Sequence, residues 1–79
     1  MKTSVQEYIE KMLAQAQYEY DESVKSWVGS IRGVRGVYAQ GASVEEVRHE
    51  LSEMLEENLL LAIRDKREVS GFRLKSIHA

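Results

Sequence analysis

Apolar residues near the start of the chain recur at the spacing of a helix. Between residues 4 and 16 they fall three or four positions apart, which places them on one helical face. Ser4 and Glu7 have the spacing of a capping box, in which each side chain satisfies a backbone N–H at the helix start. We therefore predict a helix over residues 4–16. Its apolar face consists of Val5, Tyr8, Ile9, Met12, Leu13 and Ala16.

The period changes to two after Ala16. Tyr18 and Tyr20 alternate with polar residues, which is typical of a half-buried strand. Two further short apolar runs, residues 27–31 and 37–40, are separated by a turn and are also predicted to be strands. Three short strands with short links predict an antiparallel meander. The glycines that bound the turn and end the third strand are Gly33, Gly36 and Gly41.

A second helix is predicted over residues 44–66. Ser43 and Glu46 form another capping-box pair at its start. At about 100° per residue, one arc of this helix is apolar and the opposite arc is acidic. The apolar arc holds Val44, Val47, Leu51, Met54, Leu55, Asn58 and Ala62. The opposite arc holds Glu45, Glu46, Glu50, Glu53, Glu56 and Glu57.

The second helix becomes apolar nearly all round at residues 59–63. Leu60 and Ile63 project onto the arc that carries glutamates two turns earlier. Either the first helix or a last strand covers them, or another chain does, and we take them as candidate oligomer contacts. Phe72 and Leu74 then predict a final strand after the break at Ser70-Gly71. The expected fold is α/β (α+β) in the order α-β-β-β-α-β, with the meander packed on the long helix.

Length and composition indicate one small domain spanning residues 1–79. A domain of this size has a thin core, and the chain has no cysteine to cross-link it. We therefore expect a homo-oligomer, either a dimer or a tetramer. No apolar run approaches the roughly 20 residues that span a bilayer, so we expect no membrane partner and a cytoplasmic location.

The charge is unevenly distributed along the chain. The net charge of −2 and the pI of 5.7 argue against DNA binding by this chain alone. The glutamates of the second helix can attract a basic protein. Basic residues gather towards the end of the chain and, with the strand aromatics, leave direct RNA binding open. They are Arg64, Lys66, Arg67, Arg73 and Lys75.

No residue pattern indicates a catalytic or metal centre. His49 lies four residues from Glu53 and three from Glu46, but a zinc site needs three or four ligands and no others are in view. The spacing of Gly33 and Gly36 fits neither the P-loop nor the dinucleotide fingerprint. We expect no metal, no cofactor and no enzymatic activity. An active cleft joining His49 to the glutamates is the least favoured alternative.

The order of the motifs resembles the HicB-like antitoxin family, in its short members without a DNA-binding extension. The matching segments are YEYDE (18–22), WVGSI (27–31), GVRGVYAQG (33–41) and SVEE (43–46). This chain departs from the family pattern at Arg32 and Arg35, where proline is usual before each turn glycine. Longer members carry a downstream DNA-binding unit, which we do not expect in this chain.

The resemblance implies a fold related to a partial RNase H-like or double-stranded-RNA-binding-like arrangement. It also implies a non-enzymatic role, the blocking of a small basic mRNA-cleaving toxin by covering its active site, and offers no catalytic residues. We hypothesise that the acidic arc attracts the toxin and that residues near the turns dock it. The alternatives are RNA binding through the sheet and a solitary oligomeric interaction protein without a toxin. The hypothetical partner-binding residues are Glu45, Glu46, Glu50, Glu53, Glu57, Trp27, Arg35 and Tyr38.

Overall fold

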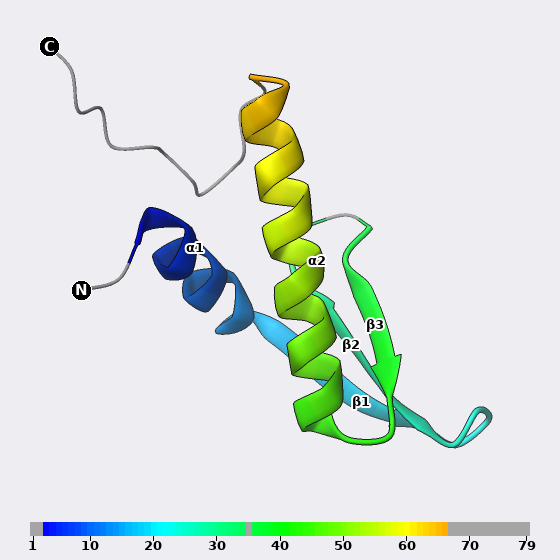
Figure 1. The fold of residues 1–79 in the computed structure, drawn as a ribbon. Helices are drawn as coiled ribbons and strands as arrows, with labels where there is room; N and C mark the ends of the chain where they lie inside the picture. The colour runs from blue at the N-terminus through cyan, green and yellow to red at the C-terminus, as the bar shows by residue number, and fades with distance from the viewer. Residues whose placement is uncertain (1–2, 35, 67–79) are drawn as a thin grey trace, which may run out of the picture.

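A computed structural model describes residues 3–34 and 36–66 and contains two helices and a three-stranded sheet (Figure 1). The α+β class and the order α-β-β-β-α are confirmed. The final strand predicted around residues 72–77 lies outside the described residues. The elements are α1 (Ser4–Leu13), β1 (Ala16–Asp21), β2 (Ser26–Ile31), β3 (Tyr38–Gly41) and α2 (Val44–Arg64).

The sheet is the predicted antiparallel meander, in the order β1-β2-β3. Tyr18 pairs with Gly29, and Gly29 pairs with Ala39. Because directly opposite residues project on the same face of a sheet, these three residues form one row across it. β3 begins at Tyr38, one residue later than predicted, and the preceding Val37 is buried.

Helix α2 lies on the face of the sheet that carries Gly29. A Cβ built on Gly29 would stand 2.5 Å from Cγ1 of Val47, so the backbone of β2 and the side chains of α2 are in close contact. Val47 and Leu51 have no exposed surface, and Leu55 is 2% exposed. The core therefore sits between α2 and the sheet, and α1 packs against α2 beside it (Figure 1).

The buried stripe of α2 differs from the predicted one at its C-terminal half. Asn58, placed on the apolar arc, is exposed, whereas Leu59 is 1% exposed. Leu59 belongs to the same buried cluster as Tyr8, Met12 and Leu13 of α1, which packs against α2. Ideal periodicity along the helix could not include this neighbour.

The helix ends also correct the prediction in detail. The capping box of α1 uses Thr3 and Gln6, whose reciprocal backbone bonds measure 3.0 and 2.8 Å, and not Ser4 and Glu7. The two pairs have the same spacing and chemistry, so sequence could not separate them. Helix α1 ends at Leu13 rather than residue 16, because Ala16 already pairs with β2.

The start of α2 is confirmed at Ser43, whose hydroxyl accepts a bond of 3.2 Å from the N–H of Glu46. The carboxylate of Glu46 accepts from the N–H of Ala42 at 2.8 Å, and not from the N–H of Ser43, so the reciprocal bond of the predicted capping box lies one residue before the cap. The helix ends at Arg64, two residues earlier than predicted. Within residues 3–34 and 36–66, neither helix has the length and apolar character needed to cross a bilayer.

Candidate interaction surface

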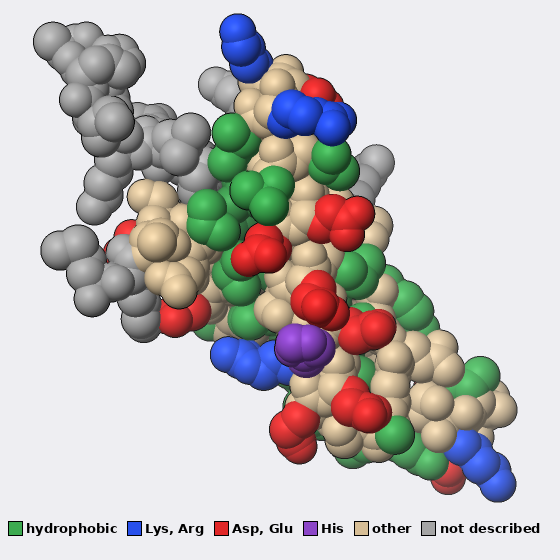
Figure 2. Space-filling model, viewed as in Figure 1, with side chains coloured by type: hydrophobic (Ala, Val, Ile, Leu, Met, Phe, Trp, Pro, Cys, Tyr) green, Lys and Arg blue, Asp and Glu red, His purple; other side chains and the backbone are tan. Residues whose placement is uncertain are grey.

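The exposed side of α2 is a row of carboxylates with one histidine among them (Figure 2). We call this row the acidic arc; it consists of Glu45, Glu46, Glu50, Glu53, Glu56 and Glu57, all exposed. Burial of Val47 and Leu51 against the sheet fixes the rotation of the helix and so turns these residues to solvent. Like charges three or four positions apart destabilise a helix by about 0.2–0.5 kcal/mol per pair. A cationic partner would relieve this repulsion.

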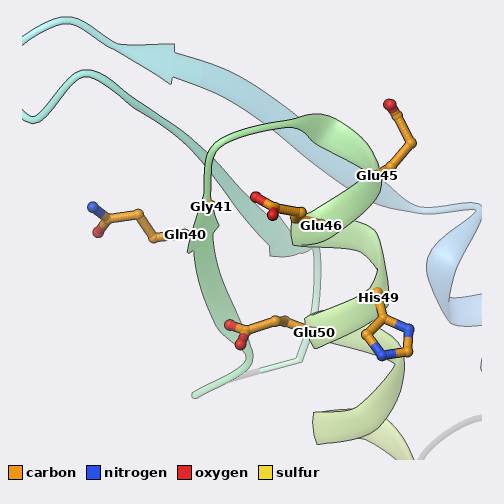
Figure 3. A pocket seen from close by; sticks show the side chains of 6 residues that line it. All are labelled: Gln40, Gly41, Glu45, Glu46, His49 and Glu50. Carbon is orange, nitrogen blue, oxygen red and sulfur yellow. The ribbon is translucent and has the colours of Figure 1, made fainter.

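A groove of about 490 Å³ lies between β3 and the first turns of α2 (Figure 3). Glu46 and Glu50 point towards β3, whereas Glu45 and His49 point away from it. Glu46 is held by its bond from Ala42, but Glu50 has no hydrogen-bond or ion-pair partner among the described residues. The groove is lined by Gln40, Gly41, Glu45, Glu46, His49 and Glu50.

A second groove, of about 400 Å³, lies on the other side of α2, against α1. Glu53 and Glu56 line it together with Gln6, Ile9 and Glu10 of α1 and with His49 and Ser52 of α2. Five of the six glutamates of the acidic arc thus line one groove or the other, Glu57 lines neither, and His49 borders both.

His49 contacts one carboxylate, at 3.6 Å between its Nε2 and Oε1 of Glu53. Both side chains are largely exposed, at 73% and 67%. Across residues 3–34 and 36–66, His, Cys, Asp and Glu side chains form no group of three or more that could hold a metal ion. When the imidazole is protonated, an exposed ion pair of this kind contributes about 0–1 kcal/mol.

The face of the sheet opposite α2 is uncovered within the described part of the chain. It contains a depression of about 540 Å³ in which Tyr38, 55% exposed, is the large aromatic side chain at the surface. Glu19 is the charged residue among those that line it. The lining residues are Gln17, Tyr18, Glu19, Val28, Gly29, Ser30 and Tyr38.

The hypothetical docking residues near the turns do not share one surface. Trp27 pairs with Gly41 and Tyr38 with Ser30, so alternation along the strands places Trp27 on the α2 side and Tyr38 on the uncovered side. Trp27 packs partly against the core and meets Tyr20 edge to face, at 5.6 Å between ring centroids and 70° between planes. Arg35 lies outside the described residues.

The two candidate contact residues of the apolar segment 59–63 differ in how far the described part of the same chain covers them. Ile63 is partly buried and packs against the core. Leu60 is 52% exposed, so no described residue covers most of it. A subunit contact through Leu60 stays a prediction.

Two hydrogen bonds from Ser23 order the hairpin between β1 and β2. The hydroxyl and the backbone N–H of Ser23 donate to Oδ1 of Asp21 at 2.6 and 2.9 Å. These bonds favour the ionised carboxylate and lower the pKa of Asp21. In the core, burial raises the pKa of the Tyr8 hydroxyl, because the phenolate would be desolvated there.

Comparisons with known proteins place this arrangement in a family. The UPF0150-like family profile matches residues 7–70. A "UPF0150 protein" of Thermotoga maritima is 50% identical over 38 residues, which cover 48% of this chain and 51% of that relative, so the match spans about half of the relative's length. The crystal structure of TTHA0281 from Thermus thermophilus superimposes with a TM-score of 0.79 at 25% identity, over 95% of this chain and 100% of that one. The chain therefore belongs to the UPF0150-like family.

Proposed function

We propose that this protein acts by binding, without catalysis, as a HicB-like antitoxin that covers a small basic mRNA-cleaving toxin. Membership of the UPF0150-like family supports a small α+β domain of this kind, and the order of the strand, turn and helix motifs supports the antitoxin interpretation. The observation that carries the proposal is the acidic arc, which presents six exposed carboxylates on a helix fixed by its buried face.

The electrostatics of the acidic arc favour a basic protein. Two opposite charges about 4 Å apart attract by about 1 kcal/mol in water, and by more when the interface excludes solvent. Carboxylates gathered on one helix also create a field that raises the rate of encounter with a cationic partner by about 10- to 1,000-fold. Several carboxylates acting together can therefore orient a basic toxin before contact.

The uncovered face of the sheet favours a protein partner over RNA. Tyr38 offers a ring on which a base could stack. Phosphate binding, however, depends on lysine and arginine, and the charged residue lining that face is Glu19. A phosphate backbone crossing it would be repelled.

The test is neutralisation of the growth inhibitor encoded next to this chain's reading frame. The neighbouring frame is induced alone and together with the chain, and colony counts and cleavage of reporter mRNA are measured. We expect the chain to restore growth and to protect the mRNA. The arc variant reverses Glu50, Glu53 and Glu57 to lysine. The matched control, with the same change in net charge, reverses Glu7, Glu22 and Asp65 to lysine, since these residues line neither groove nor the depression on the sheet.

Three lost attractions of about 1 kcal/mol each predict a Kd for the toxin raised about 100-fold in the arc variant. The control variant should bind within a few-fold of the wild type. Equal loss in both variants, or unchanged binding in the arc variant, would refute the role of the arc. If neither adjacent frame encodes a growth inhibitor that the chain relieves, the antitoxin function is wrong.

A further inference from the structure

Strand β3 has one free edge. The order β1-β2-β3 leaves its outer side unpaired by any described residue. In an edge strand, alternate residues direct their N–H and C=O groups away from the partner strand, where they can bond another chain. Gln40 and Gly41 of β3 line the groove against α2, so this free edge forms one wall of the groove.

Carboxylates form the opposite wall of the same groove. Glu46 and Glu50 point towards β3 from α2, and Glu50 has no partner among the described residues (Figure 3). A strand added beside β3 would lie about 4.8 Å from it, within the groove. Every second side chain of that strand would project to the side of the sheet on which α2 lies.

We propose that the β3 edge binds an extended basic segment of the protein partner as a fourth strand, with its basic side chains on Glu46 and Glu50. The inference rests on the proposed function, since it names the surface and the binding mode of the same basic partner. Main-chain hydrogen bonds supply affinity in such strand addition, and the alternate side chains supply specificity. Here the specificity is for lysine or arginine at every second position.

The charges on the groove disfavour two other occupants. Two copies of the chain joined edge to edge through β3 would bring Glu46 and Glu50 of each copy towards those of the other, and like charges across an interface are repelled. A nucleic-acid backbone would meet the same carboxylates. A basic peptide strand satisfies both the free backbone groups and the free carboxylate.

The first test uses a fluorescein-labelled peptide of eight residues that alternates lysine and threonine, titrated with the full chain by fluorescence anisotropy. Two further peptides carry N-methyl groups on all the lysines or on all the threonines. In an added strand, only one of these sets directs its N–H groups at β3. One methylated peptide should therefore bind as the parent does, and the other should lose about ten-fold or more in affinity. Equal binding of all three would refute strand addition.

The second test compares Glu50→Gln with Glu7→Gln. Both variants remove one negative charge, but Glu50 lines the β3 groove, whereas Glu7 lies on the exposed surface of α1 and lines neither groove. We expect Glu50→Gln to weaken peptide binding about three-fold and Glu7→Gln to have little effect, as for one exposed ion pair. Equal effects would place the peptide elsewhere.

The third test replaces Gln40 with a photo-crosslinking benzoylphenylalanine. We expect crosslinks to the labelled peptide. Crosslinks to a second copy, or to residues 67–79 of the same chain in the presence of peptide, would overturn the inference. The outcomes separate the two proposals. If the chain neutralises the toxin but the peptide tests fail, the antitoxin function is supported and this binding mode is wrong. If only one methylated peptide loses affinity but the chain does not neutralise a toxin, the edge site is supported and the antitoxin function is wrong.

Discussion

The contact between α2 and the sheet at Gly29 makes a sharp prediction for the variant Gly29→Ala. The added Cβ would stand 2.5 Å from Cγ1 of Val47 and 3.2 Å from both Cδ1 of Leu51 and Cδ1 of Tyr18. Val47 is fully buried and β-branched, so it has essentially one rotamer in a helix and cannot turn aside. The clash must be relieved by moving α2 away from β2.

The size of the effect follows from two opposing contributions. Overpacking a core by one methyl group costs about 1–3 kcal/mol. Replacing glycine by alanine in an ordinary strand conformation stabilises the fold by about 0.4–1 kcal/mol, because alanine lowers the conformational entropy of the unfolded chain. We expect Gly29→Ala to lower the free energy of unfolding by about 1–2 kcal/mol, a substantial fraction of the roughly 4–12 kcal/mol available to a chain of this length.

The assay is urea unfolding followed by far-UV circular dichroism, at one fixed protein concentration because self-association would shift the midpoint. A double-mutant cycle with Val47→Ala identifies the cause. Since the shorter side chain in Val47→Ala leaves room for the new methyl group, the double variant should be about 1–2 kcal/mol more stable than the two single effects predict by addition. Ser30→Ala, on the uncovered face of the same strand, is the control and should change stability by no more than about 0.5 kcal/mol. Additive effects at residues 29 and 47 would refute the close contact.

Three further predictions follow from the core, the cap and the hairpin. In urea unfolding at a protein concentration low enough to keep the chain monomeric, Leu59→Ala should lower the free energy of unfolding by about 2–5 kcal/mol. Its exposed neighbour Leu60→Ala should lower it by no more than about 0.5 kcal/mol, and similar losses would contradict the observed stripe on α2. Ser43→Ala should cost about 1 kcal/mol, seen as a midpoint about 4–8 °C lower in thermal circular dichroism, and an unchanged midpoint would argue against the cap. Because folding lowers the pKa of Asp21, its ionised carboxylate stabilises the fold above the ordinary pKa of 3.8, and this stabilisation is lost as the pH falls through the lower folded pKa. In an NMR titration, Ser23→Ala should return the pKa of Asp21 towards 3.8. Identical titration curves in the two proteins would show that Ser23 is not the cause of the lowered pKa.

The local pattern of the sequence determined which elements form and roughly where. A period of three to four residues predicted α1 and α2, and a period of two predicted β1. Both periods are local, because the first involves side chains within one or two helical turns and the second involves adjacent residues of a strand. The cap at Ser43 was predicted correctly for the same reason, since the bond joins residues three apart. The short links between the strands were enough to predict the antiparallel meander.

Only the tertiary structure decided how the elements face one another. Packing within the buried cluster shared by α1, α2 and the sheet determined that Leu59, and not Asn58, is buried. The face alternation of β2 and β3 put Trp27 and Tyr38 on opposite sides of the sheet. The placement of α2 over Gly29 put five of the six arc glutamates into two grooves and set Glu50 beside the free edge of β3. These outcomes depend on contacts between residues that are far apart in the chain. The steric fit between whole elements sets the geometry of such contacts, and the period of a single segment carries no information about that fit.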